Sequence, residues 1–200
     1  MKCLILIIIL LTNSIFGRAQ SSDSIYAFMN QDLPLQEFGK SSGIFFLSEP
    51  FIIDSNIYRK IIESEWTNTL KSIQEEFYKK CSALSLEWQK HFRWEQSKLC
   101  NKIIVQNVTD KLNFTGIRGI GLNPEISSQA RYWVRQWNKA KMEDRLVEYS
   151  SVPVFSSDGN YVLIVRGQDA GSEGGWDTIY LYRRTEDGWK IAERIIISTI

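Results

Sequence analysis

The sequence predicts an α+β fold, in which N-terminal helices pack on a C-terminal antiparallel meander of four strands. Between Tyr58 and Phe92, apolar residues recur at steps of three and four, which is the period of one helical face. From Arg145 onward, four runs rich in β-branched and aromatic residues alternate with short turn-forming segments. Because the two patterns occupy separate parts of the chain, we expect a helical layer that covers a sheet within one compact domain.

Residues 20–143 are expected to be mainly helical. A short helix is predicted near Ser24–Asn30, followed by a polar loop and then by a short strand in the segment GIFFLS. Farther along, Asn123 is expected to cap a helix whose first position is Pro124, where the fixed φ of proline is favourable.

The longest periodic stretch of this region lies between Asp54 and about Asn101. Asp54 or Ser55 is expected to cap its start, since both side chains accept hydrogen bonds from the first backbone N–H groups of a helix. A pattern of this length is unusual for one helix of a globular protein. We therefore predict an interruption near Ser82–Ser85 and a second helix through about Asn101.

Residues 144–200 are expected to form the antiparallel sheet. Asp158-Gly159 and Asp187-Gly188 lie between apolar runs, and Asp-Gly in that position is the strongest short-range signal of a hairpin. Pro153 is expected on an edge strand or at a bulge, because proline cannot donate a ladder hydrogen bond. Trp189 is predicted to anchor the last strand under the tryptophan-bearing helices, and alternation is expected to place on its side Ile191, Glu193, Ile195 and Ile197.

Residues 1–19 have the pattern of a secretory signal peptide. Lys2 precedes an almost purely aliphatic run from Cys3 to Leu11, and Gly17-Arg18-Ala19 supplies small residues at the two positions that signal peptidase recognises. The run is shorter than the roughly 20 residues that span a bilayer. We therefore expect cleavage after Ala19 and a secreted or periplasmic protein.

The charge and hydropathy of the mature chain limit the classes of partner that we expect. After cleavage the chain keeps 22 of its 24 basic residues against 23 acidic ones. A nearly neutral chain lacks the basic balance that nucleic-acid binding favours, so nucleic acid is not an expected partner. No later segment is long and apolar enough to predict a membrane span in the mature chain.

The closing third of the chain resembles a known group of proteins. The segments YSSVPVFSSDGNYVLIVRG and IYLYRRTEDGWKIAE resemble the end of small exported proteins of unknown function from Bacteroidetes-type bacteria. The shared pattern is Ser-x-Pro-x-Phe-Ser-x-Asp, a glycine loop and Gly-Trp-Lys, and it is carried here by Ser151, Pro153, Phe155, Ser156, Asp158, Gly174–Gly175 and Gly188-Trp189-Lys190. The resemblance covers about a quarter of the chain and implies no activity. Many members of the group carry cysteines in the glycine loop, and this chain has none there.

A weaker resemblance concerns the last strand. The segment EDGWKIAERIII is similar to the final strand of the NTF2-like fold, which implies a cone of helices against a curved sheet. NTF2-like domains serve both as enzymes and as binding modules, so this resemblance leaves the function open.

The glycine-rich segment RGQDAGSEGGWDT is a candidate site. Asp169, Glu173 and Asp177 recur every fourth residue, and calcium prefers such oxygen donors. The acids of an EF-hand loop alternate instead, so we favour the bend of a hairpin over a calcium site. Trp176 is a candidate for contact with a sugar or a peptide, and a position in the core is the alternative.

Two cysteines, Cys81 and Cys100, remain after removal of the leader. An oxidising compartment permits a disulfide between them. Two separate buried thiols are the alternative, because sequence spacing does not show that two cysteines come within bridging distance.

Candidates for catalysis and cofactor binding are few. His91 is the one histidine, and nothing in the sequence places a nucleophile and an orienting acid beside it. A zinc site normally takes four ligands, mostly His and Cys, so neither zinc nor another cofactor is expected. We hypothesise an exported, non-enzymatic binding module for a protein, peptide or glycan. The alternative is an NTF2-like secreted hydrolase that uses acidic residues in a pocket between helices and sheet.

Overall fold

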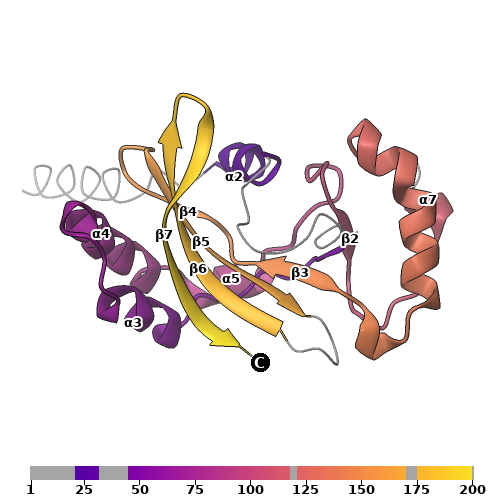
Figure 1. Ribbon diagram of the computed structural model, residues 1–200, viewed down its shortest axis with the longest axis horizontal. Coiled ribbons are helices and arrows are strands. Elements are labelled where there is room, and N and C mark those ends of the chain that lie inside the picture. Colours follow the sequence, from indigo (N-terminus) through magenta and orange to yellow (C-terminus); the bar gives the residue numbers. More distant parts are fainter. Residues whose placement is uncertain (1–20, 32–44, 118–120, 170–174, 200) are drawn as a thin grey trace, which may run out of the picture.

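The computed structural model describes residues 21–31, 45–117, 121–169 and 175–199. Within this part of the chain, one mixed sheet is covered by helix α2 (Ser22–Met29) on one face and by α3 (Ser55–Glu63) and α4 (Lys71–Ser82) on the other (Figure 1). The predicted α+β class is confirmed, with N-terminal helices and C-terminal antiparallel hairpins.

The sheet differs from the predicted meander in its topology. In chain order its strands are β1 (Phe45–Leu47), β2 (Ile103–Val105), β3 (Val147–Ser150), β4 (Val154–Phe155), β5 (Tyr161–Asp169), β6 (Gly175–Thr185) and β7 (Gly188–Thr199). They lie in the order β2-β1-β3-β5-β6-β7, and β4 pairs with β5 beside β3. β1 is parallel to β2 and β3, and the other pairings are antiparallel. The meander is therefore correct for β5-β6-β7, and its first predicted strand is divided into β3 and β4, which both pair antiparallel with β5. The prediction missed β1 and β2, which extend the sheet beyond β3 by parallel pairing.

A short interruption separates β3 from β4. There the Ser151 N–H donates to the carbonyl oxygen of Val165 (2.9 Å), and the Ser151 hydroxyl accepts from the Val165 N–H (3.0 Å). The hydroxyl thus takes the place of a backbone carbonyl in the ladder. Pro153 lies in this interruption, where its missing N–H leaves no gap inside a strand.

The helices begin where the sequence predicted caps. Beyond α2, α3 and α4, the described chain contains α5 (Leu86–His91), α6 (Phe114–Ile117) and α7 (Pro124–Lys139), with short 3₁₀ turns at Asn68–Leu70 and Met142–Asp144. The Asp54 side chain accepts from the first N–H groups of α3, and Asn123 caps α7 with Pro124 at its first position. Both predicted caps are confirmed.

The long periodic stretch breaks twice, and only one break was predicted. The predicted break lies between α4 and α5, whereas the other lies at residues 64–67. There the buried Gln74 side chain donates to the carbonyl oxygens of Ile61 (2.5 Å) and Ser64 (2.8 Å), so an internal amide satisfies the end of α3. The predicted extension to Asn101 is wrong. After His91 the chain runs beside β1, where the Trp94 N–H donates to Ser48 O (2.9 Å).

Alternation along β5 and β6 divides the core between the two faces of the sheet. The α2-face cluster comprises chiefly Ile25, Tyr26, Phe28, Met29, Phe46, Trp94, Leu99, Val152, Val162, Ile164, Tyr180 and Tyr182. The α3–α4-face cluster comprises chiefly Ile53, Ile57, Ile61, Trp66, Leu70, Phe77, Cys81, Val154, Leu163, Val165, Ile179 and Leu181. A third cluster packs α7 on β1, β2 and β3, at the end of the sheet far from α3 and α4 (Figure 1).

Two β-bulges in β7 correct the predicted arrangement of the last strand. The register with β6 shifts near Ala192 and again near Ile197, and each shift leaves one extra residue in β7. A one-residue shift moves later side chains to the other face. Trp189 and Ile191 therefore pack on the α2-face cluster, whereas Ile195 and Ile197 pack on the α3–α4-face cluster. The aromatic partner that covers Trp189 is Phe28 of α2, so the predicted cover by tryptophan-bearing helices is wrong.

Candidate functional site

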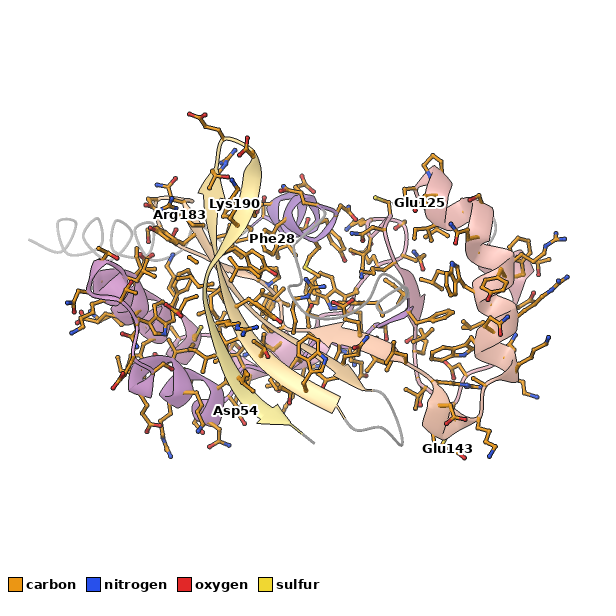
Figure 2. The ribbon with its side chains drawn as sticks, viewed as in Figure 1. Phe28, Asp54, Glu125, Glu143, Arg183 and Lys190 are labelled. Atoms are coloured by element: carbon orange, nitrogen blue, oxygen red, sulfur yellow. The ribbon has the colours of Figure 1, made fainter. Side chains whose placement is uncertain are left out.

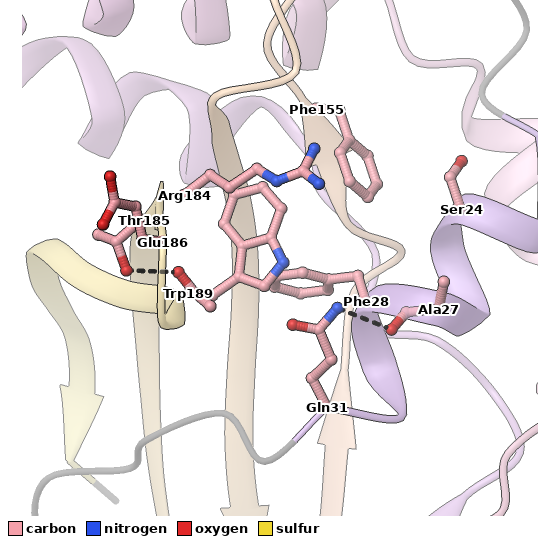
Figure 3. Close-up of a pocket in the computed structure, with 10 residues that line it drawn as sticks. Ser24, Ala27, Phe28, Gln31, Phe155, Arg184, Thr185, Glu186 and Trp189 are labelled. Atoms are coloured by element: carbon pink, nitrogen blue, oxygen red, sulfur yellow. Dashed lines mark hydrogen bonds between the residues drawn. The ribbon is translucent and has the colours of Figure 1, made fainter.

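A pocket of about 350 Å³ lies between α2 and the β6–β7 hairpin (Figure 3). Phe28 points from α2 toward the sheet, and Arg183 and Lys190 lie on the β6–β7 hairpin next to it (Figure 2). The pocket is at the end of β6 and β7 where their tight turn lies, whereas the end of β5 at Asp169 and the start of β6 at Gly175 pair with each other at the opposite end.

Three aromatic rings form the wall of this pocket. The ring centroids of Phe28 and Trp189 are 5.3 Å apart, and those of Phe28 and Phe155 are 5.9 Å apart. The rings of Phe155 and Trp189 complete the triangle at 6.4 Å. All three pairs meet edge to face, which is a favourable geometry for aromatic rings. Phe28 is almost fully buried by these contacts, so Phe155 and Trp189, which are partly buried, offer most of the exposed ring surface of the pocket.

The hairpin turn fixes the position of Trp189. Gly188 has a φ of 111°, a backbone conformation that side chains rarely adopt. The Thr185 hydroxyl donates to the Gly188 carbonyl oxygen (2.8 Å), and the Arg184 N–H donates to the carbonyl oxygen of Asn160 (2.8 Å). One hydrogen bond thus closes the β6–β7 turn that carries Trp189, and another links this turn to the neighbouring β4–β5 turn.

The rim of the pocket is polar and carries both signs of charge. Arg184 and Glu186 come from the hairpin, and Ser24 and Gln31 come from α2 and its C-terminal end. Figure 3 shows the Arg184 guanidinium extending over the opening, between Trp189 and Phe155. Neither Arg184 nor Glu186 forms an ion pair with another of the residues that the structure describes. An apolar hollow beneath such a rim suits a ligand with an apolar group and polar flanks.

A buried ion-pair network lies farther along the same face of the sheet. Arg166 Nη2 donates to Glu148 Oε1, and Lys102 Nζ donates to Glu148 Oε2 (2.8 Å). Burial would raise the pKa of Glu148, but the charges of Arg166 and Lys102 hold that pKa below its ordinary value of 4.5. Burial likewise opposes the charge of Arg166, yet the neighbouring carboxylate raises the pKa of its guanidinium. Both groups are therefore charged at neutral pH.

Tyr182 connects this network to the pocket. Its ring packs against Phe28 at a centroid distance of 5.6 Å, and its hydroxyl interacts with Arg166. Burial raises the pKa of Tyr182 above 10, so the hydroxyl is neutral at physiological pH. The α2 face therefore joins an aromatic pocket to a charged interior through one side chain.

The candidate residues of the glycine-rich segment do not come together as one site within the described chain. Trp176 lies on β6, half-buried against the α2-face cluster, with its ring 6.4 Å from that of Tyr180. Asp177 Oδ1 accepts a hydrogen bond from the Tyr149 hydroxyl (2.7 Å). Asp169 ends β5, and Glu173 lies outside the described residues. The calcium site and the ligand contact of Trp176 remain untested predictions.

Gly167 leaves the room that the Tyr149–Asp177 contact needs. It pairs with Tyr149 on β3 and with Asp177 on β6, so the three residues form one row across the sheet. A Cβ atom on Gly167 would lie 2.3 Å from the Tyr149 ring and 2.4 Å from Asp177 Oδ1. A glycine of the candidate segment therefore serves the packing of the sheet.

Cys81 and Cys100 are free thiols in the structure. Cys81 is part of the α3–α4-face cluster, where burial raises the pKa of its thiol to about 12. The Cys100 N–H donates to the Asn30 side chain (2.9 Å) at the end of α2, which belongs to the other face. The structure thus places Cys81 and Cys100 on different faces of the sheet, and the predicted disulfide stays a prediction.

His91 is exposed and lies next to an acid of its own helix. Its side chain is 74% exposed, and Nδ1 lies 3.4 Å from the Glu87 carboxylate one turn earlier. Nδ1 also lies 2.8 Å from the Glu87 carbonyl oxygen, which fits a capping role at the end of α5. His91 thus contacts the backbone and the side chain of its own helix.

The Ser-x-Pro-x-Phe-Ser-x-Asp pattern builds the turn between β4 and β5. The Ser156 hydroxyl donates to Asp158 Oδ1 (2.5 Å) and accepts from the Tyr161 N–H (2.9 Å). Asp158 accepts again from the backbone and side chain of Asn160, and Gly159 takes a φ of 72°. Among the resembling residues, Phe155, Gly188 and Trp189 also line the pocket, whereas Ser156 and Asp158 build the turn.

Comparisons of the chain with protein-family models, curated proteins and solved structures found no match. Among the residues that the structure describes, no group of three or more His, Cys, Asp or Glu side chains is arranged to hold a metal ion. No helix within the same ranges has the length and hydropathy of a membrane span.

Sequence reasoning missed most of the residues that form these sites. Phe28 and Phe155 gave no signal, because their contact joins segments more than a hundred residues apart. The buried ion pair had a readable signal, since Glu148 and Arg166 are opposite charges within two segments that were expected to form strands. Charged residues are almost never fully buried unless they are paired.

Proposed function

We propose that the protein is an exported binding module that holds a short peptide segment in the pocket between α2 and the β6–β7 hairpin. The observation that carries this proposal is the aromatic wall of Phe28, Phe155 and Trp189 beneath a rim of mixed charge. An apolar side chain of the peptide would fill the hollow, because aromatic surface contributes most of the energy of such contacts.

The size and rim of the pocket favour a peptide among the partners that the sequence left open. A volume of about 350 Å³ is at the small end of ligand pockets and suits one or two side chains. Glu186 offers acceptors, Arg184 offers donors, and the Gln31 amide and Ser24 hydroxyl offer both. This mixture matches the alternating N–H and C=O groups of a peptide backbone.

The proposed place of action is outside the cytoplasm. The support is the leader pattern of residues 1–19, which lie outside the described residues. Expression with this leader in a secreting bacterial host should release a chain that begins near Gln20. Recovery of the intact chain in the cytoplasm would contradict export and leave the peptide pocket unaffected.

Peptide binding is tested by fluorescence anisotropy with a library of labelled short peptides, with a glycan array run in parallel. We expect saturable binding of peptides that carry a large apolar side chain, and a loss of about tenfold or more with Trp189→Ala, since buried aromatic anchors cost at least that much on truncation. Trp88→Ala is the matched control, because Trp88 is an exposed tryptophan on α5 outside the pocket. Equal binding by wild type and Trp189→Ala, or binding of glycans alone, would refute the proposal.

The alternative of an NTF2-like hydrolase requires an acid that can change its protonation state in a pocket between helices and sheet. Glu148 is the acid whose buried position comes nearest to this description, and its two cationic partners lower its pKa. A general acid needs a pKa raised toward neutrality. The ion pairs of Glu148 therefore favour the binding hypothesis over the hydrolase.

A further inference from the structure

One charged side chain lies over the opening of the pocket between α2 and the β6–β7 hairpin. Arg184 on β6 pairs with Trp189 on β7, and directly opposed residues of an antiparallel pair point to the same face of the sheet. In Figure 3 the Arg184 guanidinium extends between the rings of Trp189 and Phe155. The Glu186 side chain lies beside Thr185 in the same view and extends away from the aromatic rings. A ligand whose apolar group fills the hollow therefore comes next to the guanidinium of Arg184.

The side-chain donors of Arg184 are open to a ligand. Within the described ranges, its guanidinium forms no ion pair and no side-chain hydrogen bond. Two other polar side chains of the pocket already donate to backbone carbonyl oxygens, the Ser24 hydroxyl to Ser21 (2.8 Å) and the Gln31 amide to Ala27 (3.2 Å). A guanidinium has five N–H donors and no acceptor, so its best partner is an anion with paired oxygen acceptors, such as a carboxylate.

The charges of the β6–β7 hairpin also favour an anionic group. Lys190 and Asp187 pair with each other at the turn (3.0 Å). The remaining charges at this end of the hairpin are the two arginines Arg183 and Arg184 and the carboxylate of Glu186. This end therefore carries one net positive charge, which a carboxylate balances. A phosphate monoester, with a charge of about −1.5 to −2, would exceed it.

We propose that the pocket recognises the C-terminal residue of a peptide, with a large apolar side chain in the aromatic hollow and the terminal carboxylate on Arg184. This inference rests on the proposed function and names the part of the peptide that is bound. In a C-terminal residue the carboxylate and the side chain share one Cα atom, so both reach neighbouring groups of the pocket. An acidic side chain one residue away in an extended peptide points to the opposite face instead. A volume of about 350 Å³ suits one such residue.

Matched peptides test the role of the terminal carboxylate. The probes are tetrapeptides Gly-Gly-Gly-X, labelled with fluorescein at the N-terminus, in which X is Phe, Trp or Leu and the C-terminus is a free acid or an amide. Fluorescence anisotropy at one pH and ionic strength measures the dissociation constant of each. We expect the free acid to bind about tenfold more tightly than its amide, the low end for a hydrogen bond to a charged group, because Arg184 lies at an exposed rim. Gly-X-Gly-Gly with a free carboxylate separates the two groups and should bind as weakly as the amide.

Substitution of the two neighbouring arginines locates the carboxylate. Arg184→Gln removes the charge and keeps the backbone N–H that donates to Asn160, so the hairpin should stay folded. This variant should bind the free acid about tenfold more weakly and the amide as wild type does. Arg183→Gln is the matched control, because Arg183 is exposed, lies outside the pocket and points to the opposite face of β6. It should keep the preference for the free acid.

The outcomes separate this inference from the proposed function. Equal binding of free acid and amide by wild type, or a preference for the acid that persists in Arg184→Gln, would overturn the C-terminal assignment and leave the peptide pocket in place. Saturable binding of neither the free acids nor the longer peptides of the library would overturn both.

Discussion

The two faces of the central strands have different side chains although they share one backbone. Toward α3 and α4, β5 and β6 present Leu163, Val165, Ile179 and Leu181, all apolar and almost completely buried. Toward α2, the alternate positions of the same strands include buried Arg166, Gln168 and Thr178 among apolar and aromatic residues. One face is built like an ordinary core, whereas the other contains costly buried polar groups.

Under the proposed function, the α3–α4 face serves stability, whereas the α2 face also serves binding. An apolar face packed against two helices supplies free energy of unfolding through burial and needs no particular partner. The α2 face combines buried charges with the aromatic pocket and presents its chemistry beside a single short helix. We therefore expect substitutions on the α3–α4 face to act mainly on folding, and substitutions on the α2 face to act also on ligands.

The largest effect is expected from Phe77→Ala on the α3–α4 face. Phe77 is completely buried, and truncation of a buried phenylalanine costs about 3–5 kcal/mol in the free energy of unfolding. Urea denaturation followed by circular dichroism measures this loss. Ile62→Ala, at a neighbouring helix position that is 42% exposed, is the control and should change stability by about 0.5 kcal/mol.

A smaller loss of stability is expected from Trp189→Ala on the α2 face. The indole is partly buried against Phe28 and Phe155, so about half the cost of a fully buried aromatic residue, roughly 2 kcal/mol, should be lost. The same urea titration provides the measurement. A loss equal to that of Phe77→Ala would show that the α2 face is as important for folding as the other, and would end the contrast between them.

Glu76 links α4 to the β4–β5 turn. The substitution Glu76→Gln is expected to lower the free energy of unfolding by about 1 kcal/mol. The Glu76 carboxylate accepts from the backbone N–H (2.6 Å) and hydroxyl (2.9 Å) of Ser157, and it pairs with Lys80 (3.0 Å). Burial opposes its charge, but these partners lower the pKa of Glu76. Its stabilisation is therefore present above pH 4.5 and is lost as the pH falls through the lowered value. Glu75→Gln, at an exposed neighbouring position, is the control and should leave thermal unfolding unchanged.

The smallest effect is expected from a change of pH above 5, which should hardly alter the stabilisation that the buried ion pair of Glu148 and Arg166 contributes. The pKa of Glu148 is lowered on folding, so the contribution of its charge is complete above its ordinary value of 4.5 and is lost as the pH falls through the folded value. The difference in melting temperature between wild type and Glu148→Gln/Arg166→Met should therefore be constant from pH 8 to 5. Below pH 4.5 the melting temperature of the wild type should fall relative to that of the double variant. A shift already at pH 6 would indicate a raised pKa and an acid suited to catalysis.

Local chemistry predicted the features of the fold that depend on neighbouring residues. Asp54 and Asn123 cap helices and Asp187-Gly188 closes a hairpin, because each depends only on the next few backbone groups. The parallel pairing of β1 with β2 and β3 depends on strands of three or four residues that are far apart in the sequence. The break at residues 64–67 depends on Gln74, whose polar side chain lies in the core. Neither feature has a local signal.

The same reasoning explains what was missed at the sites. Trp189 was singled out for its place after a tight turn, but the bulges in β7 decided which residues share its face. The aromatic wall brings together α2, β4 and β7, and no spacing within one segment encodes that meeting. Opposite charges in two strands with buried apolar residues were the one available signal, and they mark the ion pair of Glu148 and Arg166.

The two bulges of β7 also affect the tendency of the protein to self-associate through its sheet edge. β7 is the last strand of the sheet order, and a long regular edge of this kind is a template for strand addition and aggregation. The register shifts near Ala192 and Ile197 divide the twelve-residue edge into short regular stretches. Lys190, Glu193 and Arg194 add charges between them. An incoming strand would have to reproduce both irregularities, so the features that set the side-chain pattern of β7 also protect its edge from amyloid-like pairing.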